Sequence, residues 1–350
     1  MKVSAINSYN YKTHSLRQAS EPSFEGKLQL KETANKVITK KNIFNFALLS
    51  YLITKVLSFS EIDTPELIND LPLYILSGTF CVTDNQTKLE ENIEFKKAET
   101  IEEAKKFAEE KLGIKKFKIN DLEYANWINE GLTNISNRFK GEVYFPQKIK
   151  FHSYDRKGAL ADYGVAFDTI RINRKRIEER VSDLDNLLKE NSYEELTKYN
   201  LGKGYEDFCK KLTKAYNSPE SLTFFEKYSL VGSIYKVKQR LKQLENKNPN
   251  EINTNGINMY GNIYQNEFET IYHEVGHCFD FKSKALIDIL IDRFKHKKDL
   301  KPLILPNYPK KNTLEFVASI FAGIMQGEKY QDDVMNLYKE LIKFKMPDDN

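Results

Sequence analysis

His273-Glu274-Val275-Gly276-His277 sets two imidazoles four residues apart, with a carboxylate directly after the first. On an α-helix, residues i and i+4 lie on one face, so both imidazoles can reach one metal ion while Glu274 is turned towards it. This is the H-E-x-x-H pattern of zinc sites. It predicts that His273 and His277 bind one Zn²⁺ per chain, with Glu274 beside the metal. The alternative is a core helix that happens to carry two histidines.

The residues around this pattern favour a helix. Phe268, Ile271, Val275 and Phe279 recur at three- and four-residue spacing, as an amphipathic helix with a buried face requires. Glu267 and Glu269 are expected in its first turn, where negative charge suits the helix dipole. Gly276 lowers helix propensity by roughly 1 kcal/mol against Ala. We therefore expect another element to approach the helix closely at Gly276.

A catalytic zinc ion takes three protein ligands and keeps a position for water, so a third ligand is needed. Ser283 stands where a third motif histidine would be, six residues past His277. The other histidines are His14 in a polar terminus, His152 at the end of a strand-like stretch and His296 in a basic run. All three are interpreted as surface residues.

A carboxylate on a second helix is the better candidate. The segment from Asn312 to Met325 is apolar apart from its start, Glu315 and Ser319, which predicts a buried helix with Asn312 or Thr313 at its N-terminus. A glutamate inside such a helix needs a partner to offset its burial, and a metal ion is one. Ser319 follows at i+4 and could support that carboxylate. Alternatively, Glu315 sits in an exposed first turn.

These two segments together resemble the sequence pattern of one protein family, with the matching residues at corresponding positions. His273-Glu274-Val275-Gly276-His277-Cys278-Phe279-Asp280 and Glu315-Phe316-Val317-Ala318-Ser319-Ile320-Phe321 resemble the metallopeptidases of the anthrax lethal factor and Pro-Pro endopeptidase group. Their pattern is H-E-x-G-H-x-x-D, then a glutamate ligand that opens an E-F-x-A-x-x-F helix, as in gluzincins. They also place a tyrosine seven residues before that glutamate, where Tyr308 stands here. Ser319 replaces an acidic residue that members often carry. The resemblance covers about residues 260 to 325.

The resemblance implies a zinc-dependent endopeptidase. His273, His277 and Glu315 would be the metal ligands. Glu274 would take the proton of a water that attacks a peptide carbonyl and pass it to the leaving amine. Tyr308 would donate a hydrogen bond to the developing oxyanion, unless it is an ordinary loop tyrosine among 20.

Other interpretations of the same residues stay open. Asp280 could orient a histidine or be a helix-surface charge. The chain could also be a non-catalytic binding or scaffold protein on a zincin-like fold, or a metal-dependent hydrolase that is not a protease.

The predicted fold class is α+β, mostly helical, with a helical N-terminal region ahead of a zincin-like domain. Residues 1–26 are expected to be a disordered tail and 27–118 a mainly helical region, whose helix at Thr100–Leu112 begins with a capping box. Residues 119–350 would form the catalytic domain, with a helical insertion at about 174–245. Further expectations are helices at 27–75 and Asp121–Phe139, the latter carrying Trp127 in the core, a strand or turn at Ser77–Thr83 and a linker at 246–258.

A small sheet is expected ahead of the helix that carries the histidines. Lys148–Phe151, Tyr163–Phe167 and Ile170–Ile172 are predicted strands, the last two joined tightly at Asp168-Thr169. The resemblance implies an edge strand that pairs with an extended substrate, which we place within Gly164–Asn173. The alternative is an ordinary hairpin that binds nothing.

Composition agrees with a globular enzyme, and the resemblance implies that its substrate is a peptide or protein. The 350 residues are 40% hydrophobic and 30% charged, with a net charge of +4. The sequence contains neither a basic helix nor the spacing of a zinc finger, which argues against a nucleic-acid partner. Three isolated cysteines indicate no disulfide framework and a reducing compartment.

No targeting segment is evident in the sequence. Ile43–Leu57 is interrupted by polar residues and falls short of the ~20 residues that a membrane span needs. Residues 1–26 contain no apolar run of the kind that a signal peptide has. We expect a cytoplasmic protein, or one exported without a recognisable signal peptide. Nothing in the sequence indicates an oligomeric state.

Overall fold

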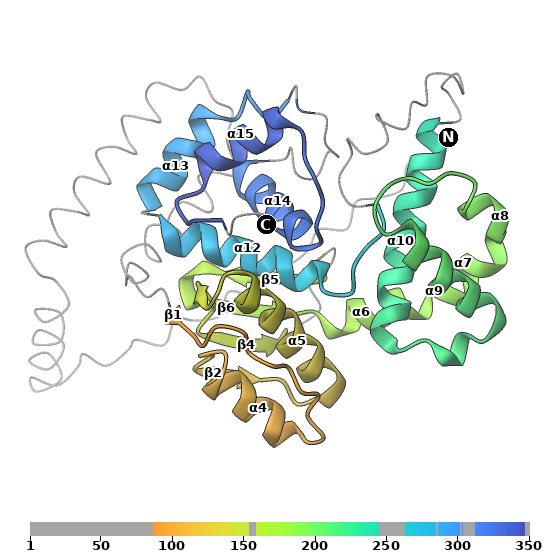
Figure 1. Cartoon of the computed structure of the whole chain (residues 1–350), viewed down its shortest axis with the longest axis horizontal. Coiled ribbons are helices and arrows are strands. Elements are labelled where there is room, and N and C mark those ends of the chain that lie inside the picture. Colours follow the sequence, from red (N-terminus) through yellow and green to blue (C-terminus); the bar gives the residue numbers. More distant parts are fainter. Residues whose placement is uncertain are drawn as a thin grey trace, which may run out of the picture. The chain divides into compact units, whose positions relative to one another are not determined.

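The computed structural model describes residues 87–153, 159–244, 263–284, 286–301, 303 and 312–346. Several expectations lie outside these residues: the tail at 1–26, the helices at 27–75, the strand or turn at Ser77–Thr83, the linker at 246–258 and Tyr308. The described part is α+β and mostly helical, with a small mixed sheet of four strands, as predicted (Figure 1). None of its helices combines the length and the apolar character that crossing a membrane requires.

The four-stranded sheet has the order β2-β4-β6-β5. Its strands are β2 (Lys116–Lys118), β4 (Lys148–Phe151), β5 (Ala161–Gly164) and β6 (Thr169–Ile172). β2, β4 and β6 are parallel, and β5 pairs antiparallel with β6 at the edge of the described sheet. Two shorter strands, β1 (Thr87–Lys88) and β3 (Glu142–Val143), form a separate antiparallel pair.

Two expectations about the sheet are wrong. The strand predicted at Tyr163–Phe167 ends at Gly164, because Val165–Phe167 forms the 3₁₀ turn η1 and Asp168 reverses the chain at φ 44°, in the left-handed region. The proposed substrate span Gly164–Asn173 consists mainly of β6, which is paired on both sides and has no free edge. The edge strands of the described sheet are β2 and β5, and β5 is the one that contacts α12.

Two helices pack beside β2 and β4 in the main hydrophobic core. They are α4 (Ile101–Glu110) and α5 (Leu122–Arg138), and both were predicted. Thr100 Oγ1 accepts a hydrogen bond from the Glu103 N–H at 3.2 Å, and Asp121 caps α5 in the same way. β2 ends at Lys118, the last residue of the expected N-terminal region. It pairs with β4, which lies in the expected catalytic domain, so one sheet contains strands from both regions.

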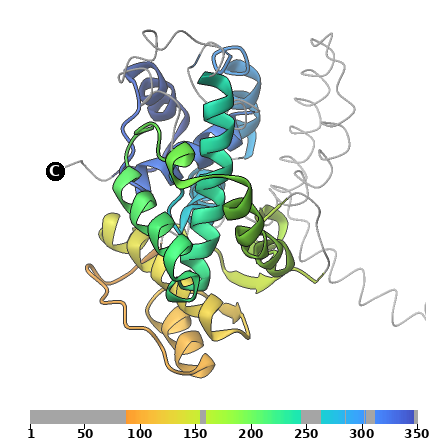
Figure 2. The same cartoon turned by 90° about the vertical axis from the view of Figure 1, so that its right-hand side faces the viewer.

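The expected insertion is helical and has its own hydrophobic core. Its elements are α6 (Arg174–Ser182), α7 (Leu184–Glu190), α8 (Tyr193–Leu196), α9 (Tyr205–Asn217), η2 (Pro219–Ser221) and α10 (Phe224–Leu244). Figure 2 shows the long α10 with the shorter helices beside it. Trp127 of α5 is buried and stacks on Phe225 of α10 at 4.3 Å between ring centroids, which confirms its predicted role in the core.

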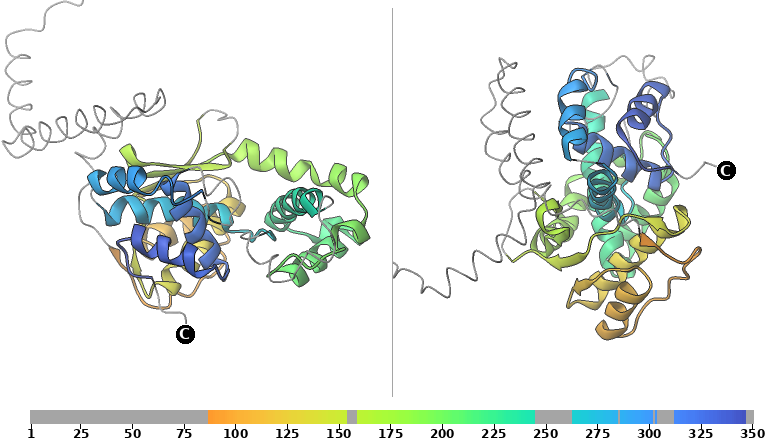
Figure 3. Two further views of the ribbon diagram at one scale, coloured as in Figure 1. Left: turned by 90° about the horizontal axis from the view of Figure 1, so that it is seen from above. Right: turned by 90° about the vertical axis from the view of Figure 1, so that its left-hand side faces the viewer.

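The C-terminal part is a set of helices that packs against the sheet. It comprises α12 (Glu269–Ser283), α13 (Leu286–Lys295), α14 (Thr313–Met325) and α15 (Asp332–Leu341). α12 contacts both β5 and α14, and Figure 3 shows β6 running on into α6. α12 begins at Glu269, so Glu267 lies ahead of the helix, where its carbonyl accepts a hydrogen bond from Trp127 Nε1 at 3.0 Å.

Candidate metal centre

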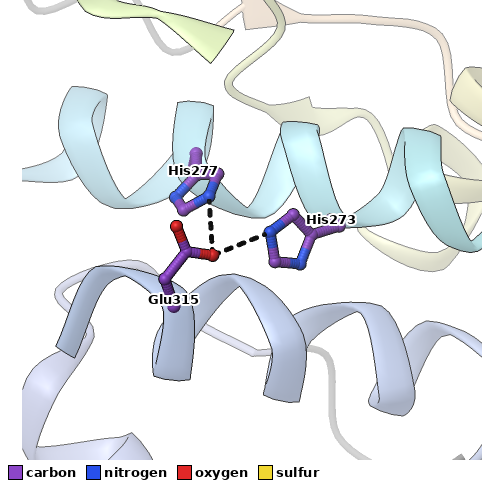
Figure 4. Close-up of side chains that lie close together, drawn as sticks. All are labelled: His273, His277 and Glu315. Carbon is purple, nitrogen blue, oxygen red and sulfur yellow. Dashed lines mark hydrogen bonds and ion pairs between the residues drawn. The ribbon is translucent and has the colours of Figure 1, made fainter. Parts of the chain in front are cut away.

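Three predicted ligands meet between α12 and α14. His273 and His277 lie on one face of α12, and Glu315 reaches them from α14 (Figure 4). Oε2 of Glu315 is 3.2 Å from Nε2 of His273 and 3.7 Å from Nε2 of His277. The three ligand atoms all lie within 4.8 Å of one another. Two imidazole nitrogens and one carboxylate oxygen at this separation fit a single zinc ion.

Gly276 explains how the two helices come so close. A Cβ atom at this position would lie 2.9 Å from the Ala318 Cα atom and 3.1 Å from the Phe321 Cβ atom, closer than side chains normally pack. The close approach predicted at Gly276 is therefore confirmed, and the approaching element is α14 itself.

The backbone of Glu315 is held by the start of α14. Asn312 is the N-cap, as expected, and its Oδ1 accepts a hydrogen bond from the Glu315 N–H at 3.0 Å. Glu315 thus sits in the first turn, yet its side chain is only 20% exposed and turns towards the histidines. Among the described residues, no hydrogen bond joins the Ser319 hydroxyl to this carboxylate.

The carboxyl group of Glu315 is held in its ionised form. Burial alone would raise its pKa, but the hydrogen bond with His273 and the nearby imidazole of His277 outweigh that effect and hold the pKa well below the usual range. The anionic carboxylate is the form that binds a metal ion.

Glu274 lies on the side of α12 that meets β5. It is buried, and the backbone N–H of Tyr163 donates a hydrogen bond to its carboxylate. Burial raises the pKa of Glu274 to about 7; His273 opposes this shift, while Asp162 and Glu315 add to it. The chain therefore places a carboxyl group, able to hold or release a proton near neutral pH, next to the ligand cluster.

Asp168 ties β5 to α12, a role that the sequence did not reveal. Its carboxylate accepts hydrogen bonds from the Tyr163 hydroxyl at 2.9 Å and the Gln147 N–H at 3.1 Å, and lies 2.7 Å from Lys282 Nζ on α12. Asp168 was identified only as part of a tight turn. Its positive φ follows from that turn, whereas its contacts with α12 follow from packing.

Asp280 belongs to a buried ion pair, so its interpretation as a helix-surface charge is wrong. It is 1% exposed, and Lys284 Nζ lies 2.6 Å from its Oδ1 and 3.2 Å from Oδ2 of Asp292. Burial raises the pKa of Asp280, while Lys284 and His277 lower it.

Two histidines expected at the surface are buried. The His152 side chain is 2% exposed, with Nε2 3.1 Å from Oδ2 of Asp162. His296 is 3% exposed, with Nδ1 2.8 Å from Oδ2 of Asp299. The acidic neighbours explain why these two histidines are buried. Neither histidine belongs to the group of His273, His277 and Glu315, which is the one group of potential metal ligands found in the described residues. His14 and Tyr308 lie outside them.

Neither a protein-family model, nor a curated protein, nor a solved structure matches this chain.

Proposed function

We propose that this chain is a zinc-dependent endopeptidase of gluzincin type on a zincin-like fold, with one Zn²⁺ held by His273, His277 and Glu315. The observation that carries the proposal is the convergence of these three ligand atoms within 4.8 Å, beside the buried Glu274. Three protein ligands leave a coordination position for water, which distinguishes catalytic zinc sites from closed structural ones.

The chemistry follows from the residues around the cluster. A zinc ion bound there would lower the pKa of water and polarise a peptide carbonyl. Glu274 takes the proton of the attacking water and passes it to the leaving amine, and the N–H of Tyr163 orients its carboxylate for both steps. Tyr308 is the proposed donor to the oxyanion that develops on the carbonyl.

The edge strand β5 suits a peptide substrate. Its one partner in the described sheet is β6, and the Tyr163 N–H on its other side is directed to Glu274 on α12. An extended peptide that pairs with the free side of β5 would therefore lie beside α12, which contacts β5 and carries Glu274. This replaces the span at Gly164–Asn173 that the sequence alone suggested.

Metal analysis and peptide profiling of the purified chain test the proposal. We expect one zinc ion per chain, cleavage of members of a peptide library, and loss of cleavage when a chelator removes the metal. Absence of both zinc and cleavage would overturn the proposal.

Zinc without cleavage would favour the second candidate, a non-catalytic binding or scaffold protein on the same fold. The intact Glu274, buried next to the ligands, supports the enzyme instead. Cleavage of non-peptide esters or amides alone would favour a different metal-dependent hydrolase.

A further inference from the structure

The sheet carries an array of lysines on the face opposite the hydrophobic core. Lys116 of β2 pairs with Lys148 of β4, and Lys118 pairs with Lys150. Side chains alternate along a strand, and the intervening Phe117 and Ile149 are buried in the core. The four lysines therefore share the other face, which we call the lysine face.

The charges of the lysine face repel one another. Like charges directly opposite on neighbouring strands destabilise a sheet. The pKa of Lys148 is lowered, first by loss of solvation and then by Lys150, Lys118 and Lys116. Within the described part of the chain, none of the four lysines forms an ion pair with an acidic side chain. The neighbouring Arg171, opposite Lys150 on β6, pairs with Asp162 instead.

We propose that the lysine face docks on an anionic phospholipid surface. Neighbouring strands lie about 4.8 Å apart and alternate residues about 6.8 Å apart, so the face presents a closely spaced array of positive charge. Lysine ammonium groups are mobile point charges that attract phosphate head groups without requiring one geometry. Binding to such a surface would relieve the repulsion between the lysines.

The other residues of this face favour a lipid surface over nucleic acid. Besides the lysines and Arg171, its positions are Asp162, Gly164 and Thr169, so it offers no aromatic ring for base stacking. Phe167 is 80% exposed in the turn between β5 and β6. That turn lies at the end of the sheet where Lys148 pairs with Thr169. An exposed ring beside a basic face suits the boundary between head groups and acyl chains.

This surface is separate from the candidate metal centre. The lysines lie on β2 and β4, whereas the three ligands lie on α12 and α14. The proposal therefore does not depend on zinc binding or on peptidase activity, and lipid binding is expected to persist in a chelator.

Vesicle sedimentation of the full chain tests the proposal. We expect binding to vesicles that mix phosphatidylserine with phosphatidylcholine, little binding to phosphatidylcholine alone, and weaker binding as salt rises. Replacing Lys116, Lys118, Lys148 and Lys150 by Gln is expected to lower the partition coefficient several hundred-fold, at about fivefold per lysine. Phe167→Ser is expected to lower it several-fold at any salt concentration.

The matched control replaces the same number of exposed lysines outside the sheet, namely Lys189, Lys198, Lys210 and Lys339, by Gln. It makes the same change in net charge and is expected to keep most of the binding. The variant of the lysine face is expected to melt no lower than the unmodified chain, because repulsion is removed, so lost binding is distinguishable from unfolding.

Three results would overturn the proposal: equal binding to both kinds of vesicle, an equal loss in the control variant, or displacement from vesicles by a stoichiometric DNA oligonucleotide or polyglutamate. The last result would assign the face to a soluble anionic polymer.

Discussion

Nε2 of His273 lies 3.2 Å from Oε2 of Glu315, although the two residues are 42 positions apart in the chain. This contact crosses the interface between α12 and α14, where Gly276 allows the helices to approach. Any change that separates the helices should therefore affect metal binding before it affects the rest of the fold.

Gly276→Ala tests this relationship. The added methyl group would meet the backbone of Ala318 at 2.9 Å, so α14 must shift. We expect a loss of about 1–3 kcal/mol in the free energy of unfolding and at least tenfold weaker zinc binding, measured by urea unfolding and metal titration. Gly131→Ala is the control of similar crowding, because its Cβ would meet the side chains of Phe268 at 3.2 Å and Ile271 at 3.3 Å, and not α14. Unchanged zinc affinity in Gly276→Ala would contradict the prediction.

Glu274→Gln separates the chemical step from metal binding. Glu274 is not one of the three clustered ligands, so zinc content should stay at one per chain. Loss of the general base should lower kcat by about 10²–10⁴-fold. The readouts are metal analysis and peptide turnover of the same preparation. A variant that loses its zinc would show that Glu274 acts in binding instead.

Tyr308→Phe tests the proposed oxyanion donor. Removing one such donor lowers kcat by about 10²–10³-fold in enzymes that use it, with little change in KM. Tyr193→Phe, in the helical insertion, is the control. Equal turnover by Tyr308→Phe and the control would favour the alternative, in which Tyr308 is an ordinary loop tyrosine.

Asp168→Asn tests the link between β5 and α12. Asparagine tolerates the positive φ at this position, so the substitution removes the charge while keeping the turn. Breaking the buried pair with Lys282 should lower the free energy of unfolding by about 3–5 kcal/mol. Tyr163→Phe, which removes only one hydrogen bond to Asp168, should lower it by about 1 kcal/mol. Urea unfolding measures the free energy of unfolding of both variants. Equal losses in the two variants would contradict the predicted contribution of the ion pair between Asp168 and Lys282.

The pH dependence of stability should change in Glu328→Gln. Burial raises the pKa of Glu328 above its ordinary value of 4.5, Lys203 and Lys236 oppose the shift, and Glu269 adds to it. A carboxyl group with a raised folded-state pKa favours folding at low pH and loses that contribution as pH rises through the folded value. The variant should therefore gain stability relative to the unmodified chain as pH rises from below 4.5 towards neutral.

Thermal unfolding across this pH range gives the test. Glu340→Gln is the opposite control, because the hydrogen bond with Lys295 lowers the pKa of Glu340. Any change in stability of this variant relative to the unmodified chain, as pH rises, should therefore have the opposite sign. Parallel pH profiles for Glu328→Gln and the unmodified chain would contradict the prediction.

Local features of this protein could be predicted from its sequence. The four-residue spacing of His273 and His277 placed both rings on one helix face, and Gly276 indicated a close neighbour, because helix geometry depends only on nearby residues. The caps at Thr100 and Asn312 were evident for the same reason.

Tertiary structure decided which distant groups meet. It brought Glu315 to the histidines, made β5 rather than β6 the edge strand, and linked Asp168 to Lys282. It also buried His152, Asp280 and His296, whose acidic or basic partners lie on other turns or elements. Periodicity states which face of an element is apolar, but the order of strands and the partners of a buried charge depend on how all the elements pack together.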